Sequence, residues 1–323
     1  MLRIRLMIPI LAGALAATAA WSQQDPQNLQ NTQSEEDGLP ATIQAPAQTG
    51  PQAASSIPHR PAGNMPMRGA NQSPAVSAAS SAASNPLNIP YLGGAVFANA
   101  KTYALWWGNP ADFAPDERDG IDDILRYGFE GSPYLALADQ YLFGSEAKTH
   151  FGGNLFDSSA PPTGDPFTSV IVAEVYNILS DNGQKPDPSA LYMVFTSNFP
   201  NENYYCAFHD LGIGPDGTVI HVIYVPNSNN TPLCWVQPPE LSCNHHSNGL
   251  QAAANSVAHE LMESITDPNV DAWVSLPTYN EIGDPCNFVY KRCVTLADET
   301  VWQLQMIWSN KVHACVQGAG SQE

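Results

Sequence analysis

Aromatic residues and cysteines are missing from a long stretch near the start of this chain. Residues 23–84 contain no Tyr, Phe, Trp or Cys and are rich in Gln, Ala, Pro, Ser and Asn. Such a segment buries too little apolar surface to offset the entropy lost on ordering. The composition therefore predicts a disordered linker over 23–84 and a packed core built from the residues that follow. The alternative is a pro-segment that packs on the domain.

The first 22 residues have the pattern of a secretory signal peptide. Arg3 and Arg5 form a basic start, an apolar run follows, and small residues suited to a signal peptidase lie at 16–20. The run is too short for a membrane anchor, so it predicts a secreted or periplasmic protein with no membrane span. Residues 85–318 are then expected to form a single globular domain, with a short tail at 319–323.

The cysteines and the charge narrow the class of protein further. All six cysteines lie in the predicted domain, which in an exported chain indicates disulfides rather than a cysteine-zinc site. Proximity suggests that Cys286 and Cys293 close a short loop, which leaves two bridges among the other four. The net charge of −19 disfavours nucleic acid and anionic membranes as partners and is compatible with cation binding.

Hydrophobic patterning predicts an α+β fold. Apolar runs indicate strands at 100–109, 190–197 and 218–226. Helical spacing and capping residues indicate helices near 115–128, 132–142, 165–183 and 247–266, and a hairpin is expected at 299–316. This order predicts a zincin-like mixed sheet packed on a long helix and on a helix that carries the metal motif, closed by a C-terminal hairpin.

The last of these helices contains the candidate metal motif His-Glu-x-x-Glu. Residues i and i+4 share a helix face, so His259 and Glu263 are expected to ligate one ion. Glu260 has the position of the general base that takes a proton from metal-activated water in His-Glu-x-x-His enzymes. Zinc accepts carboxylate oxygen and imidazole nitrogen at similar range, and the carboxylate content leaves Ca²⁺ or Mn²⁺ as alternatives.

A further ligand is expected from acidic residues downstream of the motif. Glu281 and Asp284 lie in a glycine-containing turn, and we favour them over Asp267 at the helix end. Asp267 is expected to orient a ligand instead. His245 and His246, just before the helix, are weaker candidates. The helix is apolar and alanine-rich, so it should be buried, and burying its His and Glu side chains without a partner would cost several kcal/mol.

Four segments resemble the phosphate-induced protein 1, or EXORDIUM, family. They are YALWWGNPADFAPDERDGIDDIL, LYMVFTSNFPNENYYCAFHD, TVIHVIYVPNSNNTPLCWVQPP and GLQAAANSVAHELMESITDPN, and the similarity covers 85–271. It implies a secreted, wall- or matrix-associated protein. Plant members lack the His-Glu pair, whereas bacterial proteins of similar layout carry HELxE and EIGD. The downstream acids also resemble those of gluzincins, where a Glu with a nearby Asp completes the metal site, which supports Glu281 and Asp284.

Two functions follow as predictions. The first is a secreted zincin-like metallopeptidase with Glu260 as base, acting on an extracellular peptide or cell-envelope substrate. The second is a non-catalytic, EXORDIUM-like extracellular binding protein with a structural ion site. A glycan-active enzyme with paired carboxylates is a weaker third reading, because the acids cluster around a histidine.

Overall fold

The computed structural model describes residues 63–69, 87–201, 204–236, 243 and 245–318. The predicted signal peptide, most of the predicted linker and the C-terminal tail lie outside these residues. The fold class is α+β, as predicted, with one large mixed sheet and a C-terminal hairpin. Among the helices described here, none is both long enough and apolar enough to cross a membrane.

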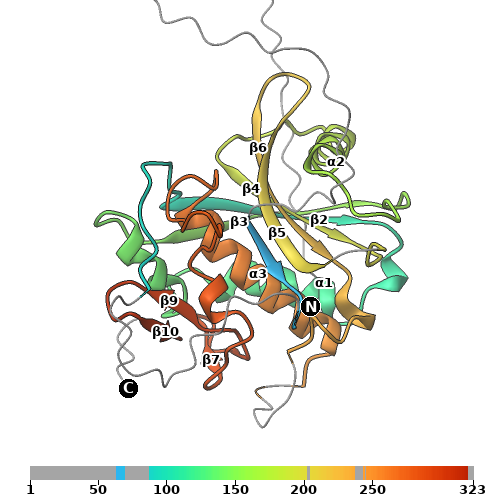
Figure 1. The fold of residues 1–323 in the computed structure, drawn as a ribbon. Helices are drawn as coiled ribbons and strands as arrows, with labels where there is room; N and C mark the ends of the chain where they lie inside the picture. The colour runs from blue at the N-terminus through green and yellow to red at the C-terminus, as the bar shows by residue number, and fades with distance from the viewer. Residues whose placement is uncertain (1–62, 70–86, 202–203, 237–242, 244, 319–323) are drawn as a thin grey trace, which may run out of the picture. The chain divides into compact units, whose positions relative to one another are not determined.

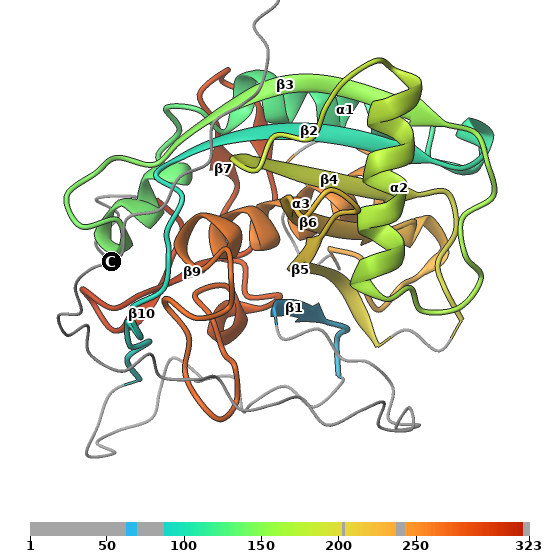
Figure 2. The ribbon, with the colours of Figure 1, turned by 90° about the horizontal axis from the view of Figure 1, so that it is seen from above.

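Six strands form the central sheet: β1 (Gly63–Pro66), β2 (Asn99–Trp107), β3 (Lys148–Asp157), β4 (Ala190–Thr196), β5 (Tyr205–Ile213) and β6 (Val219–Pro226). Their order across the sheet is β1-β5-β6-β4-β2-β3 (Figure 2). Strands β6, β4, β2 and β3 run parallel, whereas β5 is antiparallel to β6 and to β1. The three strands predicted from apolar runs correspond to β2, β4 and β6.

Two helices cover opposite faces of this sheet (Figure 1): α2 (Thr168–Asp181) and α3 (Asn248–Thr266). Successive strand residues point to opposite faces. Trp106 accordingly joins the core on the α3 side, and Trp107 joins the core on the α2 side. The central parallel strands β2, β4 and β6 are therefore buried on both faces, which explains their continuous apolar runs.

The remaining elements are short. α1 (Glu117–Asp123) continues into a π-helical turn at Ile124–Gly128. Short 3-10 helices lie at Pro110–Asp112, Leu135–Tyr141, Ser228–Asn230 and Asp284–Cys286. Two small antiparallel pairs complete the fold: β7 (Val294–Thr295) with β8 (Val301–Trp302), and β9 (Ile307–Ser309) with β10 (Ala314–Val316).

Local signals define both ends of α3. The Ser247 hydroxyl accepts a hydrogen bond from the backbone N–H of Leu250 (3.1 Å), which satisfies one of the free donors of the first turn. The backbone N–H of Ser247 in turn donates to the Asp116 carboxylate (2.9 Å). The helix ends at Thr266, two residues before Pro268. These bounds agree with the predicted helix and place the motif in its C-terminal half.

The predicted linker is wrong at residues 63–66, which form β1. This strand pairs with β5, and the side chain of Met65 is fully buried. The composition of the segment did not indicate this strand. A strand of four residues needs no apolar run when an existing sheet supplies its hydrogen-bond partners. A packed N-terminal segment, the alternative considered above, describes 63–66 better.

The predicted pairing of Cys286 with Cys293 is also wrong. The three disulfides join Cys206 to Cys234, Cys243 to Cys293, and Cys286 to Cys315. Nearness in sequence did not decide the pairing, because the 3-10 turn at Asp284–Cys286 directs the cysteine toward β10. That bridge attaches the predicted acidic turn to the C-terminal hairpin.

Glu117 provides a test of the packing beside α3. Its side chain is buried, its Oε2 accepts from the backbone N–H of Ala114 (2.9 Å), and burial raises its pKa to about 7. The folded pKa lies above the usual 4.5, so the cost of ionising Glu117 is absent below pH 4.5 and is fully present above pH 7. Glu117→Gln should therefore raise the free energy of unfolding at pH 8 by about 1–3 kcal/mol and change little at pH 4.5.

Thermal melts at the two pH values would measure this difference. Asp119→Asn, at an exposed position of the same helix, is the matched control and should behave alike at both. Equal effects of Glu117→Gln on stability at pH 4.5 and pH 8 would contradict the raised pKa of Glu117.

Candidate metal centre

Three elements bring two histidines and four carboxylates together on the α3 side of the sheet. β5 contributes His209, α3 contributes the three motif residues, and the segment 281–284 contributes two acids. The members are His209, His259, Glu260, Glu263, Glu281 and Asp284. Five of them are almost completely buried, and only the Asp284 side chain retains appreciable exposure, at 15%.

The side chains form two groups of possible metal ligands, here called donor groups. The first includes His259 and Glu263, the two ligands predicted on the helix. His259 Nε2 lies 3.2 Å from Glu263 Oε1 and 3.9 Å from Asp284 Oδ1. Two donors that each lie about 2.1 Å from a tetrahedral zinc are about 3.4 Å apart. The observed spacings therefore suit one small cation held by His259, Glu263 and Asp284.

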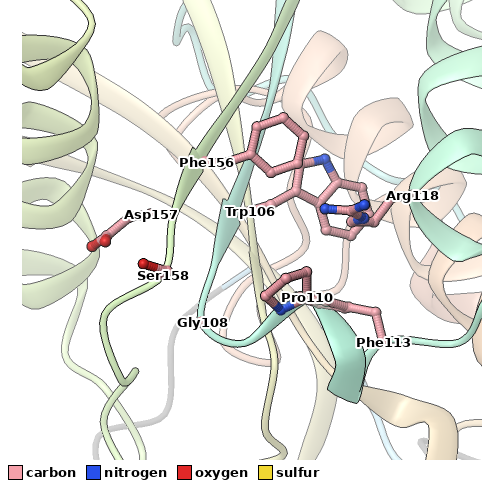
Figure 3. A pocket seen from close by; sticks show the side chains of 8 residues that line it. All are labelled: Trp106, Gly108, Pro110, Phe113, Arg118, Phe156, Asp157 and Ser158. Atoms are coloured by element: carbon pink, nitrogen blue, oxygen red, sulfur yellow. The ribbon is translucent and has the colours of Figure 1, made fainter.

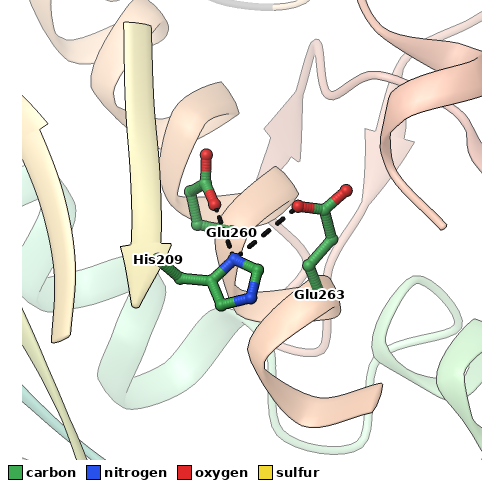
Figure 4. A group of neighbouring side chains, drawn as sticks. All are labelled: His209, Glu260 and Glu263. Atoms are coloured by element: carbon green, nitrogen blue, oxygen red, sulfur yellow. Dashed lines mark hydrogen bonds and ion pairs between the residues drawn. The ribbon is translucent and has the colours of Figure 1, made fainter. Parts of the chain in front are cut away.

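The second donor group is centred on His209, which the sequence had not suggested as a ligand. Its Nδ1 lies 3.1 Å from Glu260 Oε2 and 3.7 Å from Glu263 Oε2 (Figure 4). On the other side of the ring, Nε2 lies 3.5 Å from Glu281 Oε1 and 3.2 Å from the carbonyl oxygen of Asp267. These contacts place Glu281 beside His209 rather than in the group around His259. His209, Glu260 and Glu263 could also hold a metal ion.

Glu263 belongs to both groups. Its Oε1 faces His259 and its Oε2 faces His209. The backbone N–H of Gly283 donates to the same Oε1 (3.0 Å), which fixes the carboxylate between the two rings. A Cβ at position 283 would lie 2.8 Å from that oxygen and 2.9 Å from the His259 ring, so the close approach requires glycine.

Many donor atoms of the cluster have no hydrogen-bond partner in the part of the chain that the structure describes. They are both ring nitrogens of His259, both carboxylate oxygens of Glu281, Oε2 of Glu263 and Oδ2 of Asp267. Each unsatisfied buried polar atom costs about 1–3 kcal/mol, and more when it is charged. A cation in the group around His259 would interact with a ring nitrogen of His259 and with the carboxylates of Glu263 and Asp284, which offsets part of this cost.

The pKa directions show the same excess of negative charge. Burial opposes a charge on His259, yet the Glu263 carboxylate raises its pKa to about 10. Burial also opposes a charge on His209, and Glu260 raises its pKa to about 9. Burial and the neighbouring carboxylates raise the pKa values of Glu281 and Asp284 well above the usual range. Without a cation, the cluster therefore balances its charge with bound protons.

Asp267 closes the turn after α3. Its Oδ1 accepts from the backbone N–H groups of Asp271 and Ala272, both at 2.7 Å, and its carbonyl oxygen faces His209. The residue thus contacts His209, a histidine of the cluster, through its backbone carbonyl oxygen.

The weaker candidates lie away from the cluster. His245 is exposed, and the ring of His246 stacks on Trp302 with 4.2 Å between centroids.

A separate cavity of about 170 Å³ opens at the carboxyl ends of β2 and β3 (Figure 3) and contains none of the cluster residues. It is lined by Trp106, Gly108, Pro110, Phe113, Arg118, Phe156, Asp157 and Ser158.

The chain matches no family model, no curated protein and no solved structure. The EXORDIUM resemblance therefore rests on the quoted segments and stays a prediction.

The disulfide between Cys286 and Cys315 should matter for metal binding. Removing a native disulfide costs about 2–5 kcal/mol of stability. We expect the double variant Cys286→Ala, Cys315→Ala to lose metal affinity as well, because the bridge anchors the turn that carries Asp284 and Gly283.

Isothermal titration with zinc would measure this loss. The matched control is Cys243→Ala, Cys293→Ala, which opens a bridge that does not end in the 281–286 turn. It should lose stability but retain affinity. Unchanged affinity in the first double variant would show that the bridge does not support the site.

Proposed function

We propose that the chain is an exported metalloprotein that binds a divalent cation between His259, Glu263 and Asp284. The observation that carries the proposal is a buried His259 ring nitrogen that lacks a hydrogen bond and lies at metal-ligand spacing from the carboxylates of Glu263 and Asp284. One imidazole with two carboxylates suits zinc, and Mn²⁺ or Ca²⁺ are the alternatives because oxygen donors predominate. Three disulfides support folding in an oxidising compartment.

We further propose that this site gives the chain the chemistry of a metallopeptidase. A bound cation would polarise a scissile carbonyl and acidify a water molecule. Glu260 follows His259 on α3 and would take the proton from that water. The His209 ring, 3.1 Å from Glu260 Oε2, would orient this carboxylate. Burial raises the pKa of Glu260, although His209 acts to lower it, and a base with a raised pKa is effective nearer to neutral pH.

Metal analysis of the purified full chain tests the first proposal. After separate loading with Zn²⁺, Mn²⁺ or Ca²⁺ and gel filtration, mass spectrometry should find a stoichiometric ion for at least one metal. Glu174→Gln is the matched control, because Glu174 is a buried carboxyl on α2, across the sheet from the cluster. A wild-type chain that retains none of the three metals would overturn the proposal.

Glu260→Gln tests the peptidase chemistry separately. General-base catalysis contributes about 10²–10⁴-fold, so this variant should retain the metal and lose at least about 100-fold of any hydrolysis of denatured protein. Equal rates for wild type and Glu260→Gln would exclude Glu260 as the base.

The second candidate function is the non-catalytic binding protein that the EXORDIUM resemblance implies. Burial favours it, because His259, Glu260 and Glu263 are all 0% exposed and a catalytic metal needs an open coordination position. A chain of this kind would bind the metal and lose stability on chelation, with no hydrolysis in the wild type or in Glu260→Gln.

A further inference from the structure

The segment 63–68 lies on the sheet as a bound peptide would. Its strand β1 occupies the edge position and pairs antiparallel with β5, with Gly63 opposite His209. Beyond the strand, the backbone N–H of Met67 donates to the carbonyl oxygen of Tyr204 (3.1 Å). Main-chain pairing with an edge strand is a general way in which proteins bind extended peptides.

This segment contacts the buried cluster of the candidate metal centre through two of its members. The backbone N–H of Met65 donates to Glu260 Oε1 (3.0 Å), so the proposed base is engaged by the chain's own backbone. Gly63 rests on the His209 ring, where a Cβ would lie only 2.2 Å from Cε1. The segment therefore contacts both members of the Glu260–His209 pair.

Side-chain contacts add selectivity to the main-chain pairing. The Met65 side chain is 0% exposed and belongs to the core on the α3 side. The Asn287 side chain donates to the carbonyl oxygen of Pro66 (3.0 Å). The Arg68 guanidinium lies over the Phe288 ring, 4.4 Å from its centroid. An apolar residue, an extended backbone and a basic residue are thus recognised in succession.

We propose that the edge of β5 is a peptide-binding site and that residues 63–68 are its intramolecular occupant. The ligand class is an extended peptide with glycine, an apolar residue and a basic residue at the positions of Gly63, Met65 and Arg68. Such peptides are the substrate class for the metallopeptidase proposed above. Hydrolysis of the peptide depends on that proposed function, whereas binding of the peptide does not. A tethered occupant acts at an effective concentration of about 1 mM, so a free peptide binds weakly until the occupant leaves.

The test uses the full chain with a recognition sequence for a site-specific protease inserted between residues 78 and 79. After cutting, gel filtration removes the released fragment. A fluorescent peptide with the sequence of residues 60–69 is then titrated with the chain, and its anisotropy is measured in the presence of a chelator. The cut chain should bind this peptide at least about tenfold more tightly than the uncut chain does.

A second variant removes the dependence on cutting. Met65→Asp in the uncut chain places a charge in the buried position and should release the segment, so that the wild-type peptide again binds at least about tenfold more tightly. A peptide carrying the same Met65→Asp change is the matched control and should not bind. The proposal is overturned if the cut chain and the Met65→Asp chain, both folded by circular dichroism, bind no better than the uncut wild type. Equal binding of the two peptides also overturns it.

The two proposals fail in different ways. Peptide binding without metal retention or hydrolysis would leave the peptide site intact and remove the peptidase. Metal-dependent hydrolysis at equal rates in the cut and uncut chains would support the peptidase and overturn the assignment of 63–68 as an occupant.

Discussion

A Glu263→Gln chain should emerge from zinc loading and gel filtration without stoichiometric metal. Glu263 is the one carboxylate shared by both donor groups, so this change removes a charged ligand from each of them. Changes to residues that only support a ligand cost about 10–100-fold in metal affinity. Loss of Glu263 itself is expected to exceed that range, and titration calorimetry with zinc would measure it.

Two further variants locate the ion within the cluster. Asp284→Asn should also lose the metal, because Asp284 Oδ1 lies in the group around His259. Glu281→Gln should retain it, because Glu281 lies against His209. The opposite pattern would move the ion to the His209 side, and stoichiometric metal in Glu263→Gln would contradict both groups.

Chelation is expected to lower the melting temperature by roughly 8–16 °C. A ligand present at a thousand times its dissociation constant stabilises the folded state by about 4 kcal/mol. For a domain of this size, each kcal/mol changes the melting temperature by about 2–4 °C. Differential scanning calorimetry of the zinc-loaded chain, with and without chelator, would measure the shift. A shift of the same size in Glu263→Gln would mean that the ion binds elsewhere.

The size of this shift should depend on pH in a defined direction. In the metal-free protein, the pKa values of His209 and His259 are raised from 6.5 to about 9 and about 10. Their stabilising contribution is therefore complete below pH 6.5 and is lost as the pH rises through 9 and 10. Metal binding needs deprotonated imidazole, so affinity rises over the same window. The gap between loaded and chelated melting temperatures should widen from pH 6.5 to pH 10, and a constant gap would contradict the assignment.

The sequence was most informative where the signal was local. Ser247 and Pro268 bracket α3, and both act through neighbours within a few residues, so the helix and the placement of His259 and Glu263 on one face could be read directly. The acidic turn was also found, because its residues stand together after the motif. Which of its two acids approaches which histidine could not be predicted, because only the fold places Asp284 near His259 and Glu281 near His209.

Long-range pairing accounts for what the sequence did not show. His209 contacts Glu260 across a separation of 51 residues in the sequence. The sequence alone does not distinguish a strand histidine that binds a ligand from one that packs in the sheet. The available signal was the strand register of YCAFHDLGI, in which His209 shares a face with Ala207, a residue of the core on the α3 side. β1 had no apolar pattern to reveal it, because its stability comes from β5.

The position of β1 also bears on how molecules of this protein behave beside one another. A strand at the edge of a sheet presents unpaired N–H and C=O groups, and such an edge is a template for pairing with a second chain. While residues 63–66 cover β5, that template is closed. The short β1, which ends in Pro66, thus leaves a shorter edge on this side of the sheet than β5 would, and a molecule that releases it exposes β5 to a peptide or to another copy of itself.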